Sequence, residues 1–291
     1  MSILKEFDLA IADVENTPRG FVTDKGKFDS YMSNAAWDAY LKTMSDEQRL
    51  QFDSGNGGEL KGKNGRPPKM ASFASSSRMV YKLSKDISNF VFEKQLATVI
   101  GGVANLDGYW EGNGKYVFIE AKCREPYSHK SPETIKQNYK PLYMYLQNKI
   151  PGIFSCAIEE IPETRDMRVV FFCCEKVNIH FDVKQMLCHL LGVANRMLID
   201  KICDTPIQFL YLLYNPTELS LSDKSKKSIL EIYHATCKAA ISYDFKQIFD
   251  CVVDFLIEEK QYSISKTAAD KLKSNFRFDL CDQNNYQSYF M

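Results

Sequence analysis

The sequence lacks the motifs that mark several common enzyme classes. It has no Gly-x-Ser-x-Gly elbow, Walker loop or Gly-x-Gly-x-x-Gly fingerprint, which argues against the usual hydrolases, nucleoside triphosphatases and dinucleotide-binding enzymes. Its four histidines show neither His-x-x-x-His nor His-Glu-x-x-His spacing, and no two cysteines are spaced Cys-x-x-Cys. A histidine-rich metal centre and a structural zinc site are therefore disfavoured.

Net charge is also missing, because 37 Lys and Arg residues balance 37 Asp and Glu residues over the 291 positions. The global field cannot draw such a protein to nucleic acid or to a membrane, so any polyanion site must come from local charge. Hydrophobic residues make up 45% of the chain and charged residues 25%, which excludes a largely disordered, collagen-like or coiled-coil protein.

No apolar run is long enough to span a bilayer, and charged residues occupy positions 5, 6 and 8, where a secretory signal would need an apolar run. We therefore expect a soluble, cytoplasmic protein with no membrane partner. The nine cysteines are odd in number, and most lie in apolar stretches, so we expect reduced thiols in the core.

The turn and loop signals along the chain predict three parts of one compact α/β domain: an extension of helices and loop (1–70), a core (71–216) and a helical extension (217–291). The apolar periodicity and turn signals predict the individual elements. We expect helices at 34–44, 46–52, 83–100, 132–149 (interrupted at Pro141) and 183–198, a basic loop at 54–69, a hairpin at 103–110 and 115–123, strands at 168–174 and 207–214, and a mostly helical stretch from 222 to the end.

The hairpin brings two acids together. Asn113-Gly114 is typical of a type I′ turn, which pairs residues whose numbers sum to 227 and so places Asp107 opposite Glu120. Lys122 is two residues from Glu120 and shares its face. Opposed carboxylates repel each other unless a cation lies between them, and Mg²⁺ prefers oxygen ligands and keeps several waters. Such an ion would activate a water, while Lys122 orients it, so the pattern predicts phosphodiester hydrolysis.

Two further polar residues fit this site. Glu93 falls on the apolar face of the expected helix 83–100, where an unpaired carboxylate is costly and a metal-bound water would serve as its partner. Gln185 precedes the apolar stripe of the helix 183–198, and its amide would hold either Lys122 or a phosphate oxygen.

Glu93, Asp107, Glu120-Ala121-Lys122 and Gln185, in this order, resemble the PD-(D/E)XK nuclease superfamily over roughly residues 71–216. The resemblance implies a restriction-endonuclease-like fold with a central mixed β-sheet flanked by helices, and Mg²⁺-dependent cleavage of DNA. It also implies Asp107 and Glu120 as metal ligands with the Ala121 carbonyl, Lys122 as the group that positions the attacking water, and Glu93 as the auxiliary helix acid. Leu106 stands where the family has proline, and His189 stands where its RecB-like branch has tyrosine after the glutamine.

Other interpretations of these residues stay open. Acid-x-Lys triplets also begin at Glu59, Asp182, Asp244 and Glu258, so the triplet alone does not identify a site. Asp107 and Glu120 would also suit an exposed charged strand face, Glu93 a solvated helix acid or an ion pair with lysine, and Gln185 an ordinary helix start.

Local positive charge flanks the proposed site in sequence. Residues 54–85 contain seven Lys and Arg against the single acid Glu59, and residues 122–149 contain six against two acids. Such segments suit contact with the phosphate backbone of DNA, although a solvated loop explains the first one equally well. The residues that we expect to touch DNA are Lys69, Ser76, Ser77, Arg78, Arg124 and Lys130.

Together these observations predict a deoxyribonuclease that cuts double-stranded DNA with Mg²⁺, or Mn²⁺ in its place, and is of the restriction type. The alternatives are a repair or recombination nuclease of the RecB-like type, a non-catalytic DNA-binding protein that keeps the fold, and a structural protein with no metal. Cutting both strands usually calls for two sites, so a homodimer is one assembly that the sequence leaves open.

Overall fold

The computed structural model describes residues 2–55, 58–128, 133–160, 166–171, 181–260 and 262–291. The strands are β1 (Arg19–Thr23), β2 (Gly26–Met32), β3 (Phe90–Ala97), β4 (Val103–Gly112), β5 (Lys115–Lys122), β6 (Glu133–Lys136), β7 (Cys156–Glu160), β8 (Asp166–Phe171), β9 (Ile207–Leu213) and β10 (Phe276–Cys281). The helices are α1 (Ile3–Glu15), α2 (Asn34–Leu41), α3 (Asp46–Ser54), α4 (Ser76–Ser84), α5 (Lys140–Lys149), α6 (Val183–Ile199), α7 (Asp223–Ser242), α8 (Phe245–Lys260) and α9 (Lys266–Asn275). Short 3₁₀ helices cover Lys69–Ala71, Glu125–Tyr127, Gln137–Tyr139 and Tyr286–Tyr289.

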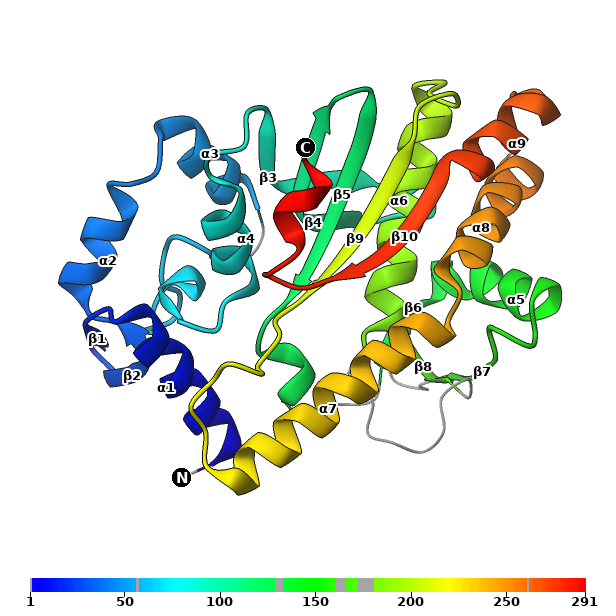
Figure 1. Cartoon of the computed structure of the whole chain (residues 1–291). Helices are drawn as coiled ribbons and strands as arrows, with labels where there is room; N and C mark the ends of the chain where they lie inside the picture. The colour runs from blue at the N-terminus through cyan, green and yellow to red at the C-terminus, as the bar shows by residue number, and fades with distance from the viewer. Residues whose placement is uncertain (1, 56–57, 129–132, 161–165, 172–180, 261) are drawn as a thin grey trace.

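A five-stranded mixed sheet forms the centre of the molecule, in the order β10-β9-β5-β4-β3 (Figure 1). β5, β9 and β10 run parallel, whereas β3, β4 and β5 are antiparallel neighbours. Helices cover both faces of this sheet, which confirms the predicted α/β fold with a central mixed sheet flanked by helices.

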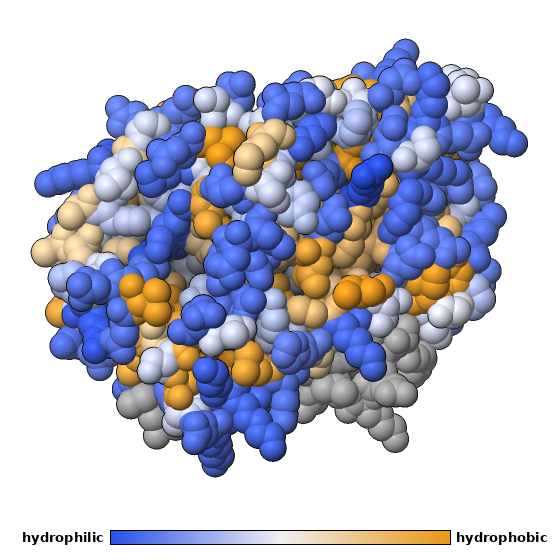
Figure 2. Space-filling view, viewed as in Figure 1, coloured by the Kyte–Doolittle hydropathy of each residue, from blue (hydrophilic) through white to orange (hydrophobic). Residues whose placement is uncertain are grey.

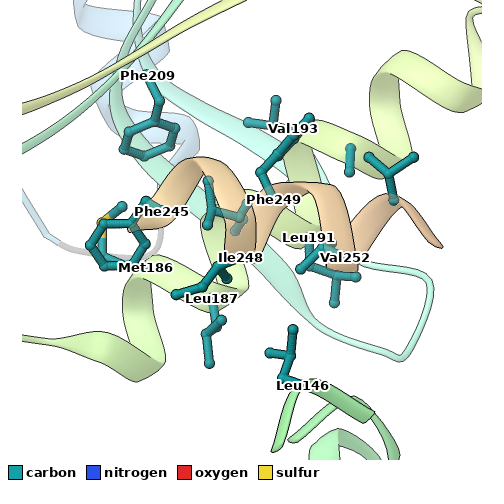
Figure 3. Close-up of a cluster of buried hydrophobic side chains, with 14 of the residues drawn as sticks. Leu146, Met186, Leu187, Leu191, Val193, Phe209, Phe245, Ile248, Phe249 and Val252 are labelled. Atoms are coloured by element: carbon teal, nitrogen blue, oxygen red, sulfur yellow. The ribbon is translucent and has the colours of Figure 1, made fainter. Parts of the chain in front are cut away.

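The two faces of the sheet are buried in separate apolar clusters, which explains the apolar run of β5. Phe118 joins the cluster formed with α6 and α8, whereas Val117 and Ile119 join the cluster formed with α4 and the N-terminal elements. Side chains of a strand alternate between the faces, so a strand that is covered on both sides is apolar at nearly every position. Figure 3 shows the first cluster, where Phe249 of α8 packs close to α6.

The predicted helix 83–100 is wrong. The helix here is α4, which begins at Ser76 because the Ser75 hydroxyl accepts the N–H of Arg78 at 3.2 Å, and it ends at Ser84. A turn follows, with Asn89 at φ 61°, and β3 then starts at Phe90. The Phe-Val-Phe run at 90–92 prefers a strand, and a short apolar run fits both periodicities, so spacing alone misidentified it.

Other boundaries also differ from expectation. Only the second half of the predicted helix 132–149 is helical, because Pro141 lies in the first turn of α5 instead of interrupting a helix. The first half forms β6, which joins β7 and β8 in a small second sheet. The expected strand 168–174 corresponds to β8, and its last residues lie outside the described ones.

The ends of the chain contribute strands that the periodicity did not predict. β1 and β2 form a hairpin near the N-terminus, and β10 lies at the edge of the central sheet beside β9. The sheet therefore draws on residues beyond the expected core of 71–216. The helices at 34–44, 46–52 and 183–198, the 103–123 hairpin and the strand at 207–214 are confirmed, with boundaries shifted by a few residues.

In the described part of the chain, no helix is both long and apolar enough to cross a membrane. The face in Figure 2 is mostly hydrophilic, with apolar patches scattered over it. The described cysteines at positions 123, 156, 188, 203, 237, 251 and 281 are all free, as the expectation of reduced thiols requires.

Candidate active site

The β4–β5 hairpin has the register that the sequence predicted. Gly112 pairs with Lys115 and the pairing continues to Gly108 and Ile119, all with numbers that sum to 227. Asn113 and Gly114 both have positive φ angles, of 49° and 70°, as a type I′ turn requires. The predicted geometry of the hairpin is therefore confirmed up to the residue next to Asp107.

At Asp107 the ladder between β4 and β5 changes. Oδ2 of Asp107 accepts the backbone N–H of Ala121 at 2.7 Å. A side chain thus satisfies this N–H of β5 where the backbone pairing with β4 stops. The Asp107 carboxylate consequently lies between the two strands, next to Glu120.

Glu93 lies on β3, and not on a helix as predicted. The pairs on either side of it, Phe92 with Gly108 and Lys94 with Leu106, place Glu93 across from Asp107. Its φ of 52° lies in the left-handed region, which costs a non-glycine residue on the order of 1–3 kcal/mol. In a regular strand Phe92 and Leu96, four residues apart, would face the same side of the sheet. Here Phe92 belongs to the cluster beside α4 and Leu96 to the cluster beside α6, so the side-chain alternation of β3 shifts between them. The strained residue therefore marks the place where the acids meet.

Lys122 is buried and is held by two oxygens. Its Nζ donates to Oε1 of Glu120 at 2.6 Å and to Oε1 of Gln185 at 2.6 Å. Gln185 lies in the first turn of α6, where Asp182 caps the helix by accepting the Gln185 N–H at 2.9 Å. The cap fixes the start of α6 and thereby aims the Gln185 amide at Lys122.

His189 is a member of the site to which the sequence gave no role of its own. Nε2 of His189 lies 2.9 Å from Oε2 of Glu120, and both side chains are 2% exposed. Neither of these two atoms makes an aligned hydrogen bond. Because His189 follows Gln185 by one helical turn, the i, i+4 spacing on α6 was the signal that would have placed both on one face.

These acids open into a polar cleft of about 540 Å³. Ser77, on α4, donates from Oγ to Oε1 of Glu93 at 3.1 Å and to Oδ1 of Asp107 at 3.5 Å. Glu59, which is buried, also lines the cleft and pairs with Lys69 at 3.0 Å. A hydroxyl and several carboxylates thus converge on one hollow between α4 and the sheet.

Burial and mutual repulsion shift the pKa values of the acids apart. Burial, with Glu59 nearby, raises the pKa of Glu93 to about 7, and burial beside Glu120 and Glu93 holds the pKa of Asp107 well above its usual value. Burial would raise the pKa of Glu120 too, but the Lys122 ammonium and His189 hold it below its usual value. The pKa of Lys122 is raised, because its pairing with Glu120 outweighs burial. One stable carboxylate therefore lies beside two that resist ionisation unless a cation is present.

The residues present suit a hard divalent cation. Oε2 of Glu120 is a buried oxygen that lies 2.9 Å from Nε2 of His189 without an aligned hydrogen bond. At the neighbouring Asp107 carboxylate, burial and the two nearby acids outweigh the attraction of Lys122, so an added cation would favour its ionised form. Within one residue of a strand the N–H and C=O point to the same neighbour, so the Ala121 carbonyl lies on the edge where its N–H meets Asp107. No three Asp, Glu, His or Cys side chains close on one point among the described residues, so waters would complete the shell.

The residues expected to contact DNA differ in their surroundings. Lys69, Ser76, Ser77 and Arg124 line the cleft. Ser76 donates to Glu125 at 3.1 Å, and Nε of Arg124 lies 3.0 Å from Asp8. Lys130 lies outside the described residues.

Arg78 is placed differently from the other residues expected to bind DNA. Its side chain is 3% exposed, forms an ion pair with Glu15 and lies beside the rings of Tyr40 and Phe73. It is absent from the lining of the cleft. A buried guanidinium that already has a carboxylate partner forms a structural ion pair, so contact between Arg78 and a phosphate would require this pair to open.

Comparisons with protein-family models, with curated proteins and with solved structures gave no match.

Proposed function

We propose that the protein is a Mg²⁺-dependent deoxyribonuclease that hydrolyses phosphodiester bonds of double-stranded DNA, as an endonuclease of the restriction type. One observation carries the proposal: Asp107, Glu120 and Lys122 meet at the floor of one cleft, with Lys122 held between Glu120 and Gln185. Two carboxylates suit a hard divalent ion that activates water for phosphodiester hydrolysis, and a buried lysine beside them suits stabilisation of the negative charge that develops.

The proposed mechanism assigns a role to each group. Asp107, Glu120 and the Ala121 carbonyl would hold the ion, which supplies polarisation of a phosphoryl oxygen and a lowered pKa of a bound water. The Lys122 ammonium orients the attacking water and stabilises negative charge that develops at the phosphorus centre. Gln185 restrains Lys122, and Glu93 with Ser77 orders water at the edge of the site.

Local cations support contact with DNA by a protein without net charge. Lys69 and Arg124 lie at the cleft that contains the acids, so they suit the phosphates on either side of the cleaved bond. A repair or recombination nuclease of the RecB-like type is the second candidate, and the hydrogen bond from Lys122 to Gln185 favours it.

The test compares the wild-type protein with Lys122→Ala on supercoiled and linear DNA, with Mg²⁺, with Mn²⁺ and with EDTA. Lys224→Ala, which removes an exposed lysine of α7, is the matched control. We expect metal-dependent cutting that only Lys122→Ala abolishes. Cutting of circular DNA indicates an endonuclease, whereas cutting of linear ends alone favours the RecB-like alternative. DNA binding without cutting on any substrate would support a non-catalytic DNA-binding protein instead.

A further inference from the structure

A second cavity, of about 490 Å³, lies beside the cleft. It is enclosed by the start of β4, the 3₁₀ turn Gln137–Tyr139 and the first turns of α6. Asn105 and Gln185 line both the cleft and this cavity, so the two hollows are adjacent. Its volume falls in the range of small-ligand sites, and the nuclease mechanism above makes no use of it.

Two residues that line this cavity each carry a buried polar atom that has no hydrogen-bond partner among the residues that the structure describes. His189 is 2% exposed and lines the cavity, and its Nδ1 has no hydrogen-bond partner. Oδ1 of Asn105 is likewise buried without a partner. An unsatisfied buried polar atom costs about 1–3 kcal/mol, so these atoms point to a ligand that supplies donors and acceptors.

The rest of the wall suits a flat ring that carries negative charge. Tyr139 offers a half-buried aromatic ring, whose hydroxyl lies 3.4 Å from Sγ of Cys188. Lys136 and Lys184 are exposed lysines at the cavity, and they outnumber Asp182, a lining acid whose Oδ1 accepts the Gln185 N–H. Gly102, which also lines the cavity, has a φ of 101°, a backbone conformation that favours glycine.

We infer that this second cavity accepts a single unpaired nucleotide of the DNA strand being cut, next to the phosphate held in the cleft. A nucleobase can stack on an aromatic ring, here that of Tyr139. The donors and acceptors at its edge match the polar atoms of Asn105 and His189. Its phosphates suit Lys136 and Lys184. Asn105 and Gln185, at the junction of the two hollows, lie where the strand would pass from one to the other.

This inference rests on the proposed nuclease function for its choice of ligand, and it makes the substrate more specific. Duplex DNA with an unpaired base beside the cleaved bond, or with a single-stranded end, is the expected substrate. Removing a base from the stack costs a few kcal/mol in paired DNA and least where the base is already unpaired, so the cavity would favour such sites.

A binding experiment tests the cavity without any cleavage. A single-stranded oligonucleotide with one 2-aminopurine is titrated in EDTA with the wild-type protein, Tyr139→Ala and Tyr139→Phe. We expect Tyr139→Ala to weaken binding by about tenfold or more and Tyr139→Phe, which keeps the ring, to bind like the wild type. Thermal melting of each variant verifies that it is folded. Equal binding by folded Tyr139→Ala, or no saturable binding by the wild type, overturns the inference.

A cleavage experiment separates this inference from the proposed function. Duplexes that are fully paired, or that carry one unpaired base, are incubated with Mg²⁺ and with wild-type protein or Tyr139→Ala. We expect the wild type to cut the unpaired substrate at least about tenfold faster, and Tyr139→Ala to lose this preference. If the wild type cuts both substrates equally fast, the inferred nucleotide site is wrong, whereas the proposed nuclease function stands. If no DNA is cut, the nuclease proposal fails, and the binding titration alone then shows whether the cavity binds a nucleotide.

Discussion

Nζ of Lys122 donates a hydrogen bond at 2.6 Å to Oε1 of Gln185, a residue 63 positions further along the chain. The bond joins the end of β5 to the first turn of α6, and the same Nζ also donates to Oε1 of Glu120 at 2.6 Å. A lysine held in this way has little freedom to leave its position, so the structure places the ammonium before any substrate binds. Restraint of this kind is what a group that orients a water molecule requires.

Replacing Gln185 should therefore lower activity without abolishing it. Removing a side chain that orients a catalytic group typically costs 10- to 100-fold, and we expect about tenfold slower turnover for Gln185→Ala. Its control is Gln247→Ala on α8, which removes an exposed glutamine far along the chain from the site. Single-turnover cleavage rates of both variants provide the measurement. A Gln185→Ala rate within twofold of the wild type would show that Lys122 needs no such support.

The acids should make metal-free stability depend on pH. The pKa of Glu93 is raised to about 7 in the folded protein from an ordinary value of 4.5, so the folded state binds more protons between these values. The contribution of Glu93 is fully present below about pH 4.5 and is lost as the pH rises to about 7. Asp107, whose pKa is also raised, acts in the same direction.

We expect the free energy of unfolding in EDTA to fall by roughly 2 kcal/mol over this window through Glu93, after allowance for solvent screening. Mg²⁺ should restore stability above pH 7, because a cation favours the ionised carboxylates. Urea titrations at pH 5 and pH 8, with and without Mg²⁺, measure both effects. Glu93→Gln should flatten the metal-free dependence, and an unchanged slope in that variant would show that Glu93 is not its source.

The sequence predicted the pairing of the hairpin that carries two of the acids better than the element that carries the third. The positions of Asp107 and Glu120 follow from the Asn113-Gly114 turn, because a two-residue turn fixes the register of every pair in the hairpin. Glu93 was placed on a helix, since apolar residues at 87, 90 and 91 fit a helical face as well as a strand. Only the tertiary context, β4 pairing along residues 103–110, decides in favour of the strand.

The remaining differences have similar causes. β10 is an edge strand whose apolar residues gain their burial from β9, a partner far away in sequence, and so local patterns carry little signal of it. Arg78 was expected to face phosphate, yet it is buried against Glu15, which lies on α1, far from Arg78 in the sequence. Sequence periodicity predicts which face of an element is apolar, but it does not reveal the long-range partner that meets a charged residue.

The cluster between α6, α8 and the sheet should dominate stability. Phe249, labelled in Figure 3, is fully buried, and its ring stacks on that of Phe276 with centroids 3.8 Å apart. Phe249→Ala leaves a cavity in a packed core, so we expect a loss of about 3–5 kcal/mol in the free energy of unfolding. Ile241→Ala, at a position that is 70% exposed, should change it by less than about 0.5 kcal/mol. Similar losses in both variants, measured by urea unfolding, would contradict this assignment of the core.

Lys69 and Arg124 should contribute to DNA affinity through charge. Each lines the cleft and keeps a partly exposed side chain, so Lys69→Gln and Arg124→Gln should weaken binding to DNA of any sequence. Each change should also reduce, by about one, the steepness with which log K falls with log salt concentration, which we call the salt slope. Arg78→Leu is the contrasting variant, because its buried guanidinium pairs with Glu15. Breaking that pair should lower the free energy of unfolding by less than the about 3–5 kcal/mol typical of a buried pair, because Lys82 still pairs with Glu15 at 2.8 Å, and it should leave the salt dependence of binding unchanged.

Binding isotherms at several salt concentrations, measured in EDTA at a temperature where all three variants are folded, separate these cases. A smaller salt slope for Arg78→Leu would mean that the guanidinium leaves Glu15 to meet phosphate when DNA binds. Unchanged slopes for Lys69→Gln and Arg124→Gln would move the DNA path away from this side of the cleft. Both outcomes can be distinguished from a folding defect, since affinity alone falls with the folded fraction, whereas the slope reports the number of phosphates neutralised.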